Sequence, residues 1–230
     1  MAFNAKTTGI AVVMASGLFL CAATAANAGA VFYSDQAAFL AATSSTSLID
    51  FEGIVADDTA IRSDSMIIDG VSFDQVGGGD VTVCGPTSFC VGAPYDSALL
   101  GTMNGYPLAI DFTGVGDVTA AGGIFGRAGI PIATAMLLLY GADDVLLDTQ
   151  KVIVGSMGQD RDDTFYGWTV DDDDVITRIV YNMFGSFDAV DDIRFGTAAA
   201  PIADVPEPTA LALLGFGLAG LGFARRRKAA

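Results

Sequence analysis

Aspartate is the residue type most available for chemistry in this sequence, and Asp191 has the most unusual position. In the segment FDAVDDIRFG, strand alternation would place Asp191 on the face that Ala189, Ile193 and Phe195 share. A carboxylate on an apolar face needs hydrogen-bond donors or a cation, because an isolated buried charge is costly. Carboxylate oxygens are also the ligands that Ca²⁺ prefers. We therefore expect Asp191 either to hold a structural calcium ion or to accept hydrogen bonds from nearby backbone.

Two other acidic clusters suggest metal sites less strongly. The segment DRDDTF at 160–165 begins like an EF-hand loop, but Thr164 and Phe165 stand where a ligand and a glycine belong. We interpret this segment as a solvated turn. The run Asp171–Asp174 lies between two predicted strands, and we interpret it as a hydrated hairpin tip.

Aromatic rings beside polar groups could bind sugar. Trp168 is the only tryptophan, and in a strand it would share one face with Tyr166. These two residues are candidate ligand-binding residues, and a core position is the alternative. Tyr95 and Tyr106 lie in loop-like stretches.

Enzymatic chemistry has little support. The chain has no histidine to act as the base of a serine or cysteine hydrolase. Paired carboxylates could hydrolyse glycosides, but Glu52 is the only glutamate before the C-terminal tail. We expect a protein that is not an enzyme, with a secreted glycoside hydrolase as a minor alternative.

The N-terminal residues 1–28 resemble a signal peptide. Lys6 precedes a short apolar run, and Ala26-Asn27-Ala28 fits the rule for signal peptidase, which predicts cleavage before Gly29. Cys21 would be removed with this segment. Cys84 and Cys90, in CGPTSFC, remain as a pair in an oxidising compartment, so we expect a disulfide between them.

The C-terminal end is apolar and then basic. Residues 209–224 are uncharged and would form a helix of roughly 24 Å, slightly short for a membrane span. A basic end follows and would stop transfer on the cytoplasmic side; it consists of Arg225, Arg226, Arg227 and Lys228.

A short proline-containing motif stands directly before this span, namely Val205, Pro206, Glu207 and Pro208. Two prolines keep the backbone extended. The motif, the glycine-rich helix and the basic end together resemble the PEP-CTERM sorting signal at 205–230. This resemblance implies processing by exosortase, a membrane enzyme of Gram-negative bacteria that make exopolysaccharide. It says nothing about the domain that the signal carries.

The segment between the two ends is acidic and reads as a single all-β domain over 29–196, followed by a linker over 197–204. Residues 29–204 contain 26 acidic and six basic residues, and this charge disfavours nucleic acid as a partner. We expect an antiparallel β-sandwich, jelly-roll-like, with one short N-terminal helix. The helix is predicted at Asp35–Ala42, and the strands at Val31–Tyr33, Leu48–Phe51, Met66–Phe73, Val81–Cys84, Leu108–Phe112, Ala121–Phe125, Thr134–Tyr140, Val145–Val154, Phe165–Val170, Ile176–Phe184 and Ala189–Phe195.

Two features of this pattern bear on the site. Residues 135–140 are apolar throughout, which predicts a central strand covered on both faces. The last strand resembles that of jelly-roll carbohydrate-binding and galactose-binding-like domains, where an aspartate in this place helps hold structural calcium.

The sequence therefore predicts an exported protein. It would be tethered to the inner membrane first and would then reach the cell surface or extracellular matrix. We expect a structural or interaction role without catalysis. The alternative is calcium-supported binding of carbohydrate, with exopolysaccharide as the partner.

Overall fold

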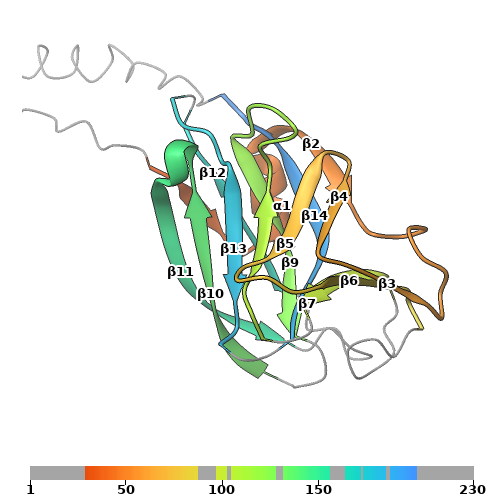
Figure 1. Ribbon diagram of the computed structural model, residues 1–230. Helices are drawn as coiled ribbons and strands as arrows, with labels where there is room; N and C mark the ends of the chain where they lie inside the picture. Colours follow the sequence, from red (N-terminus) through yellow and green to blue (C-terminus); the bar gives the residue numbers. More distant parts are fainter. Residues whose placement is uncertain are drawn as a thin grey trace, which may run out of the picture.

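The structure is a computed structural model that describes residues 29–87, 97–102, 105–127, 132–155, 164–171, 173–184 and 187–200. These residues form two antiparallel β-sheets that pack face to face (Figure 1). The expected all-β sandwich with one short helix is thereby confirmed.

Sheet A has the strand order β1-β12-β9-β14-β7-β6-β3, with β2 paired to β14 beside this path. Its strands are β1 (Val31–Tyr33), β2 (Thr43–Ile49), β3 (Ala60–Ser63), β6 (Val81–Cys84), β7 (Leu99–Thr102), β9 (Ala120–Arg127), β12 (Thr164–Thr169) and β14 (Asp188–Ala198). Sheet B has the order β11-β10-β13-β8-β5-β4. Its strands are β4 (Ser65–Ile68), β5 (Val71–Gln75), β8 (Leu108–Asp111), β10 (Ile132–Tyr140), β11 (Leu146–Gly155) and β13 (Arg178–Asn182), and the 3-10 helix η1 (Ala142–Asp144) joins β10 to β11.

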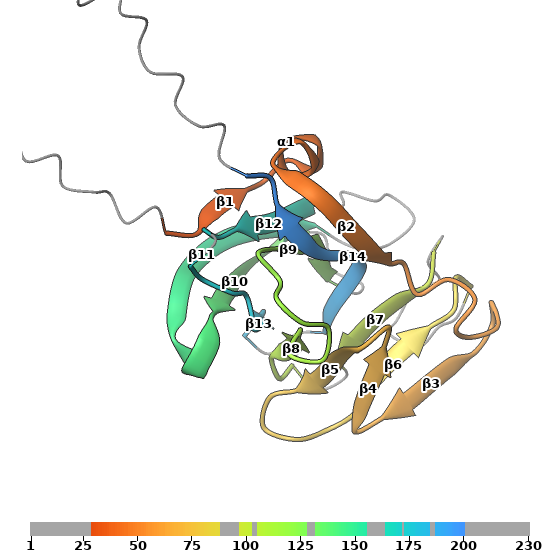
Figure 2. The same ribbon diagram turned by 90° about the horizontal axis from the view of Figure 1, so that it is seen from above.

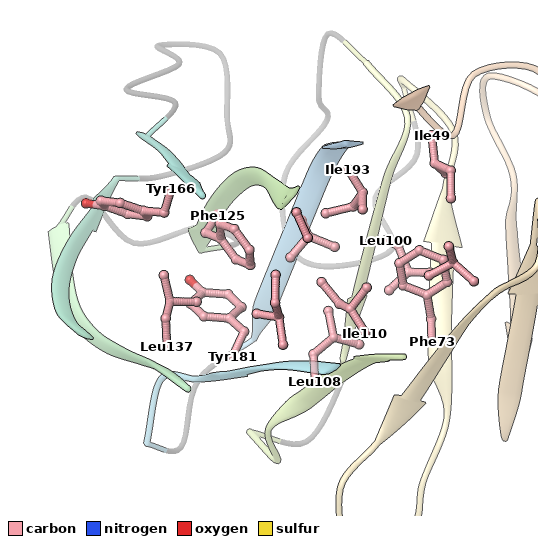
Figure 3. Close-up of a cluster of buried hydrophobic side chains, with 14 of the residues drawn as sticks. Ile49, Phe73, Leu100, Leu108, Ile110, Phe125, Leu137, Tyr166, Tyr181 and Ile193 are labelled. Carbon is pink, nitrogen blue, oxygen red and sulfur yellow. The ribbon is translucent and has the colours of Figure 1, made fainter. Parts of the chain in front are cut away.

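The core lies between the sheets and consists of apolar side chains that alternate along the strands. Figure 3 shows Phe125 of sheet A facing Tyr181 of sheet B, with their ring centroids 5.2 Å apart. Leu137, Leu108 and Ile110 of sheet B and Ile193 and Leu100 of sheet A fill the space around them.

Helix α1 (Gln36–Ala41) covers the outer face of sheet A. Its N-cap is Asp35, whose Oδ1 accepts from the backbone N–H of Ala38 at 2.7 Å. Phe39 is fully buried against Phe165 and Ala120. A Cβ on Gly167 would lie only 2.9 Å from the Phe39 ring, so the glycine makes room for this helix.

Several expected strands differ from the structure. The predicted strand Met66–Phe73 is wrong as a single strand, because Asp69 and Gly70 adopt positive φ angles of 50° and 85° and form the turn of the β4–β5 hairpin. The strands β3 and β7 were not expected. The polar strand β2 starts at Thr43, five residues before the predicted start at Leu48, and ends at Ile49.

The β10 strand is not covered on both faces as its apolar run predicted. Ala135, Leu137 and Leu139 are buried, whereas Met136, Leu138 and Tyr140 between them are half-buried. The latter face lies on the outside of sheet B, which no other layer of the described residues covers. The last strand also runs to Ala198, two residues into the predicted linker.

The two ends of the described chain emerge from the same end of the sandwich, at the top of Figure 1, and Figure 2 looks down on this end. Val31, Thr169, Ala120 and Gly196 form one row across sheet A, and alternate strands run in opposite directions. The start of β1 and the end of β14 are therefore neighbours, about 14 Å apart at three strand spacings. We call this end the terminal pole, and the opposite end, where β14 begins at Asp188, the distal pole.

Within the described ranges, no helix is long and apolar enough to cross a membrane. The predicted signal peptide at 1–28 and the tail from residue 201, with its predicted membrane helix, lie outside the described residues.

Candidate functional site

Asp191 lies on the opposite face of sheet A from the one that alternation predicted. A register shift separates Asp191 from Arg194 in the pairing with β9, and Asp192 has a positive φ of 48°. This bulge changes the parity of the strand. Val190 and Ile193 both join the core, while Asp191 pairs with Ile124 on the outer side.

The Asp191 carboxylate is nevertheless buried, with 2% of the residue exposed. Its Oδ2 accepts from the Ser97 hydroxyl at 2.8 Å, and its Oδ1 accepts from the backbone N–H of Asp192 at 2.8 Å. Glu52 holds Ala98, the residue after Ser97, in a similar way, since its Oε1 accepts from the backbone N–H of Ala98 at 2.8 Å. The two carboxylates therefore fix the chain at the entry to β7.

Asp191 therefore accepts hydrogen bonds, which is one of the two roles that the sequence suggested for it; the other was to hold a calcium ion. Among the residues that the structure describes, no three aspartate, glutamate, cysteine or histidine side chains are grouped so that they could hold a metal ion. Asp160, Asp162 and Asp163 lie outside those residues. The run from Asp171 is not a hairpin tip, because β12 and β13, which it connects, belong to different sheets.

Tyr166 and Trp168 are buried instead of forming an exposed platform. Trp168 is fully buried, and its indole Nε1 donates to Oδ2 of Asp148 at 2.8 Å. The Tyr166 hydroxyl donates to the Ile153 carbonyl at 2.6 Å. Both contacts run from β12 of sheet A to β11 of sheet B, and Phe32 packs against both rings. These side chains join the two sheets, as the core alternative predicted.

A second buried carboxyl, which the sequence did not single out, lies at the distal pole. Asp188 is 1% exposed, and neither of its oxygens accepts a hydrogen bond of regular geometry. Desolvation raises the pKa of Asp188 to about 8, against smaller lowering effects of the backbone N–H groups of Leu108 and Met183 and of Arg127. Burial, together with the nearby Asp188, also raises the pKa of Tyr181.

Asp188 belongs to a layer of polar side chains that ends the core at this pole. Arg127 pairs with Asp188 across β9 and β14, and its Nε has no hydrogen-bond partner. Gln75 pairs with Leu108 across β5 and β8, is 5% exposed, and has no partner for either side-chain atom. We call Gln75, Arg127 and Asp188 the distal polar layer. Alternation alone could have placed Asp188 in the core, because it is two residues from the buried Val190.

The distal pole also carries every exposed aromatic side chain of the described residues. Phe184 is 65% exposed, Tyr106 is 49% exposed and Phe187 is 37% exposed. The first follows β13, the second precedes β8 and the third precedes β14. The sequence signal was an aromatic residue inside a turn cluster, as in NGYP and MFGS.

Of the remaining predicted site residues, only Cys84 is described. It ends β6, is fully buried and is disulfide-bonded. Cys90 lies outside the described residues, so the pairing of these two cysteines stays a prediction. The sorting motif and the basic end lie outside the described residues as well.

The solved structures that match include two carbohydrate-binding modules. The family 29 module CBM29_1 from Piromyces equi has a TM-score of 0.35 and 14% identity, covering 64% of this chain and 95% of that one. The family 11 module of the cellulosomal cellulase Lic26A-Cel5E from Clostridium thermocellum has a TM-score of 0.22 and 12% identity, covering 69% and 98%. Likenesses of this size identify no ligand for this chain. No curated protein matches the sequence.

Comparison with protein families gives a definite result for the tail. Residues 204–228 match the PEP-CTERM protein-sorting motif, and they include the proline motif, the apolar segment and the four cations. The chain therefore consists of a two-sheet β-sandwich that carries a PEP-CTERM sorting signal at its C-terminal end.

Proposed function

We propose that this protein is an exported, non-catalytic component of the cell surface or exopolysaccharide matrix of a Gram-negative bacterium. The match of residues 204–228 to the sorting motif carries this proposal. Signal peptidase removes residues 1–28, the apolar segment 209–224 holds the precursor in the inner membrane, and exosortase processes the chain at 205–208. The domain of 29–196 then acts outside the cell.

Three properties of the domain support this proposal. The chain has a net charge of −16, which suits a soluble protein that avoids anionic surfaces and nucleic acid. Its disulfide-bonded Cys84 suits an oxidising compartment. Glu52 and Asp191, two of its candidate chemical groups, are engaged with neighbouring donors in a structural role.

Mass spectrometry of the mature protein from its host tests the proposal. We expect an N-terminus at Gly29 and a C-terminus that lacks residues 209–230. In a host strain without exosortase, the tail should stay attached and the protein should fractionate with the inner membrane. Intact 230-residue protein in the soluble cytosolic fraction would show the proposal to be wrong.

Calcium-supported carbohydrate binding is the second candidate function, with Asp191 as the residue that the sequence singles out for the metal. Calcium should then raise the melting temperature of the wild type, a chelator should reverse the change, and Asp191→Asn should reduce it. A melting temperature that does not respond to calcium or chelator would exclude the metal. A secreted glycoside hydrolase is a less favoured candidate, for which Glu52→Gln should abolish hydrolysis of the host polymer.

A further inference from the structure

The outer face of sheet B, on the side of the sandwich away from α1 (Figure 2), carries apolar side chains at its centre. Met136, Leu138 and Tyr140 of β10 point away from the core. Val180 of β13 lies directly opposite Leu138, and Ala109 of β8 lies directly opposite Val180. The solvated face of an antiparallel sheet normally carries polar side chains. An apolar patch on such a face commonly marks an interaction surface.

The charged side chains of this face are balanced, unlike those of the chain as a whole. The strands of sheet B direct two cations, Lys151 and Arg178, and two carboxylates, Asp74 and Asp111, to their outer face. The whole chain has 27 acidic and 11 basic residues. Two copies of so acidic a protein repel each other over most of their surface. A balanced face is therefore a place where a second copy can approach.

The two kinds of charge occupy different halves of the sheet. In the strand order β11-β10-β13-β8-β5-β4, the cations come from β11 and β13, and the carboxylates come from β8 and β5. The boundary between the halves lies between β13 and β8, at the middle of the six strands. Arg178 is fixed beside this boundary, because its guanidinium lies 4.6 Å from the ring centroid of Tyr140 and 2.9 Å from Oδ1 of Asp144.

The position of the C-terminal tail selects one arrangement of two copies. A two-fold axis that lies between two such faces and runs along the strands keeps both terminal poles at the same end. Both tails then leave toward one membrane, as two precursors with a PEP-CTERM signal require. An axis that ran across the strands would send the two tails in opposite directions.

This axis also brings opposite charges together. If it passes between β13 and β8, then β13 lies over β8 of the partner subunit, and β11 lies over β4 of the partner subunit, since sheets that pack face to face keep their strands roughly aligned. The basic half of each copy faces the acidic half of the other. Side chains in the same row across the sheet then meet, namely Arg178 with Asp111 of the partner subunit, Val180 with Ala109 of the partner subunit, and Leu146 with Ile67 of the partner subunit.

From these observations we propose that the outer face of sheet B is the interface of a homodimer, in which two copies of this chain pack these faces together about a two-fold axis along the strands. The direction of the axis rests on the proposed surface function, because it uses the tethered tail. Six strands at roughly 4.8 Å spacing make the face about 24 Å wide. A face of this width gives an interface at the lower end of the usual size range, so we expect a dissociation constant in the micromolar range.

Sedimentation velocity of the protein recovered from its host, in detergent if the tail is still attached, tests the dimer. Between about 1 and 100 μM the wild type should change from monomer to dimer. Val180→Thr keeps the shape of the side chain but puts a hydroxyl group at the centre of the interface in both copies, and it should weaken the dimer roughly tenfold. Val31→Thr is the matched control. Val31 is 49% exposed on β1 of sheet A, and this variant should dimerise like the wild type.

A mixing experiment tests the contact between Arg178 and Asp111. Arg178→Glu and Asp111→Arg should each sediment as monomers, because both symmetry-related contacts then join like charges. An equimolar mixture of the two variants should form dimers, since each contact between the unlike chains again joins opposite charges. Arg178 and Asp111 are also direct neighbours within one chain. Mixing leaves that pair like-charged, so only contact between chains explains a rescue. Circular dichroism checks that each variant is folded.

Three results would overturn the dimer. These are a wild type that stays monomeric at about 100 μM, a Val180→Thr variant that dimerises as the wild type does, and a mixture of two folded variants that stays monomeric. A monomer that binds neutral polysaccharide through Val180 would assign the face to carbohydrate instead. Mass spectrometry of the termini measures export separately, so an exported monomer disproves the dimer alone, and a chain that is never exported disproves the proposed function.

Discussion

Asp188 and Asp191 lie three positions apart on β14, and their carboxyl groups have very different surroundings. Asp191 accepts two hydrogen bonds at 2.8 Å on the outer face of its sheet. Asp188 faces the core beside Arg127 and has no regular hydrogen bond. Strand alternation places the two residues on opposite faces, and the bulge at Asp192 then returns Ile193 to the core face.

Because the carboxyl group of Asp188 is buried, we expect the protein to lose stability as the pH rises. Its folded pKa of about 8 lies above the ordinary aspartate value of 3.8, so between these values the folded state keeps a proton that the unfolded chain releases. The free energy of unfolding should fall through this window by at most about 1.4 kcal/mol per pH unit, and should level off above pH 8. Urea unfolding between pH 5 and 9 measures the slope.

Asp188→Asn is the matched variant for this effect. It keeps the shape of the side chain and removes the titration, so its stability should depend less on pH and should exceed that of the wild type at pH 8. Asp174→Asn, in an exposed loop, should change neither quantity. Equal pH slopes for the wild type and Asp188→Asn would contradict the prediction.

Removal of the hydrogen bond between Trp168 and Asp148 should lower the stability of the fold. Trp168→Phe keeps an aromatic ring in the core but leaves Oδ2 of Asp148 with Gln150 as its remaining donor. We expect a loss of about 1–3 kcal/mol in the free energy of unfolding, because a charged acceptor loses a partner. Chemical denaturation measures this loss, and an unchanged midpoint would show that the contact contributes nothing.

At the scale of elements, helix α1 and sheet A depend on a glycine for their close approach. Gly167→Ala would place a Cβ 2.9 Å from the Phe39 ring and 3.1 Å from the Phe165 ring. We expect a loss of about 1–3 kcal/mol, typical of an overpacked site. A double variant with Phe39→Leu should recover part of the loss in denaturant unfolding, because the smaller side chain leaves room for the new methyl group.

The predicted disulfide between Cys84 and Cys90 would close a short loop after β6. Its removal by Cys90→Ser should cost about 2 kcal/mol, since a loop of this length loses little entropy on closure. Peptide mapping without reductant should recover the two cysteines in one linked fragment. Free thiols at both positions would contradict the pairing.

The sequence is informative about short strands whose ends are marked by turn residues. The strand Val81–Cys84 and the edge strand Val31–Tyr33 agree with their predicted bounds, since β-branched and aromatic residues bounded by turns define them. β2 was expected only from Leu48, because most of its residues are serine and threonine, which give a weak strand signal. The backbone pairing with β14 holds these residues in a strand.

The candidate site was harder to predict because two of its features are not local. The parity of Asp191 depends on a bulge that sequence alternation cannot reveal. The burial of Trp168 depends on Asp148, twenty residues earlier, which reaches it from the other sheet. Tyr106 lies in a stretch that the sequence indicated as a loop, whereas Phe184 was predicted as the last residue of a strand and instead lies exposed after the end of β13.

At the scale of the whole molecule, the terminal pole, from which the C-terminal tail leaves the domain, is acidic. The connections that hold Asp117, Asp143 and Asp144 lie at this end, and so do Asp171, Asp173 and Asp174. Against an anionic bilayer these charges would repel the domain, so the proposed precursor would stand away from the lipid surface at the length of its linker. The distal pole would then point outward.

The place of β14 within sheet A has a mechanical consequence. This strand ends at the terminal pole, and it has β9 on one side and β2 and β7 on the other. A pull on the tail acts along the strand and loads all of these hydrogen bonds together, whereas a pull on an edge strand would peel them in turn. A cell that fixes this protein by its C-terminal end therefore holds it by the strand that flow or shear can extract least easily.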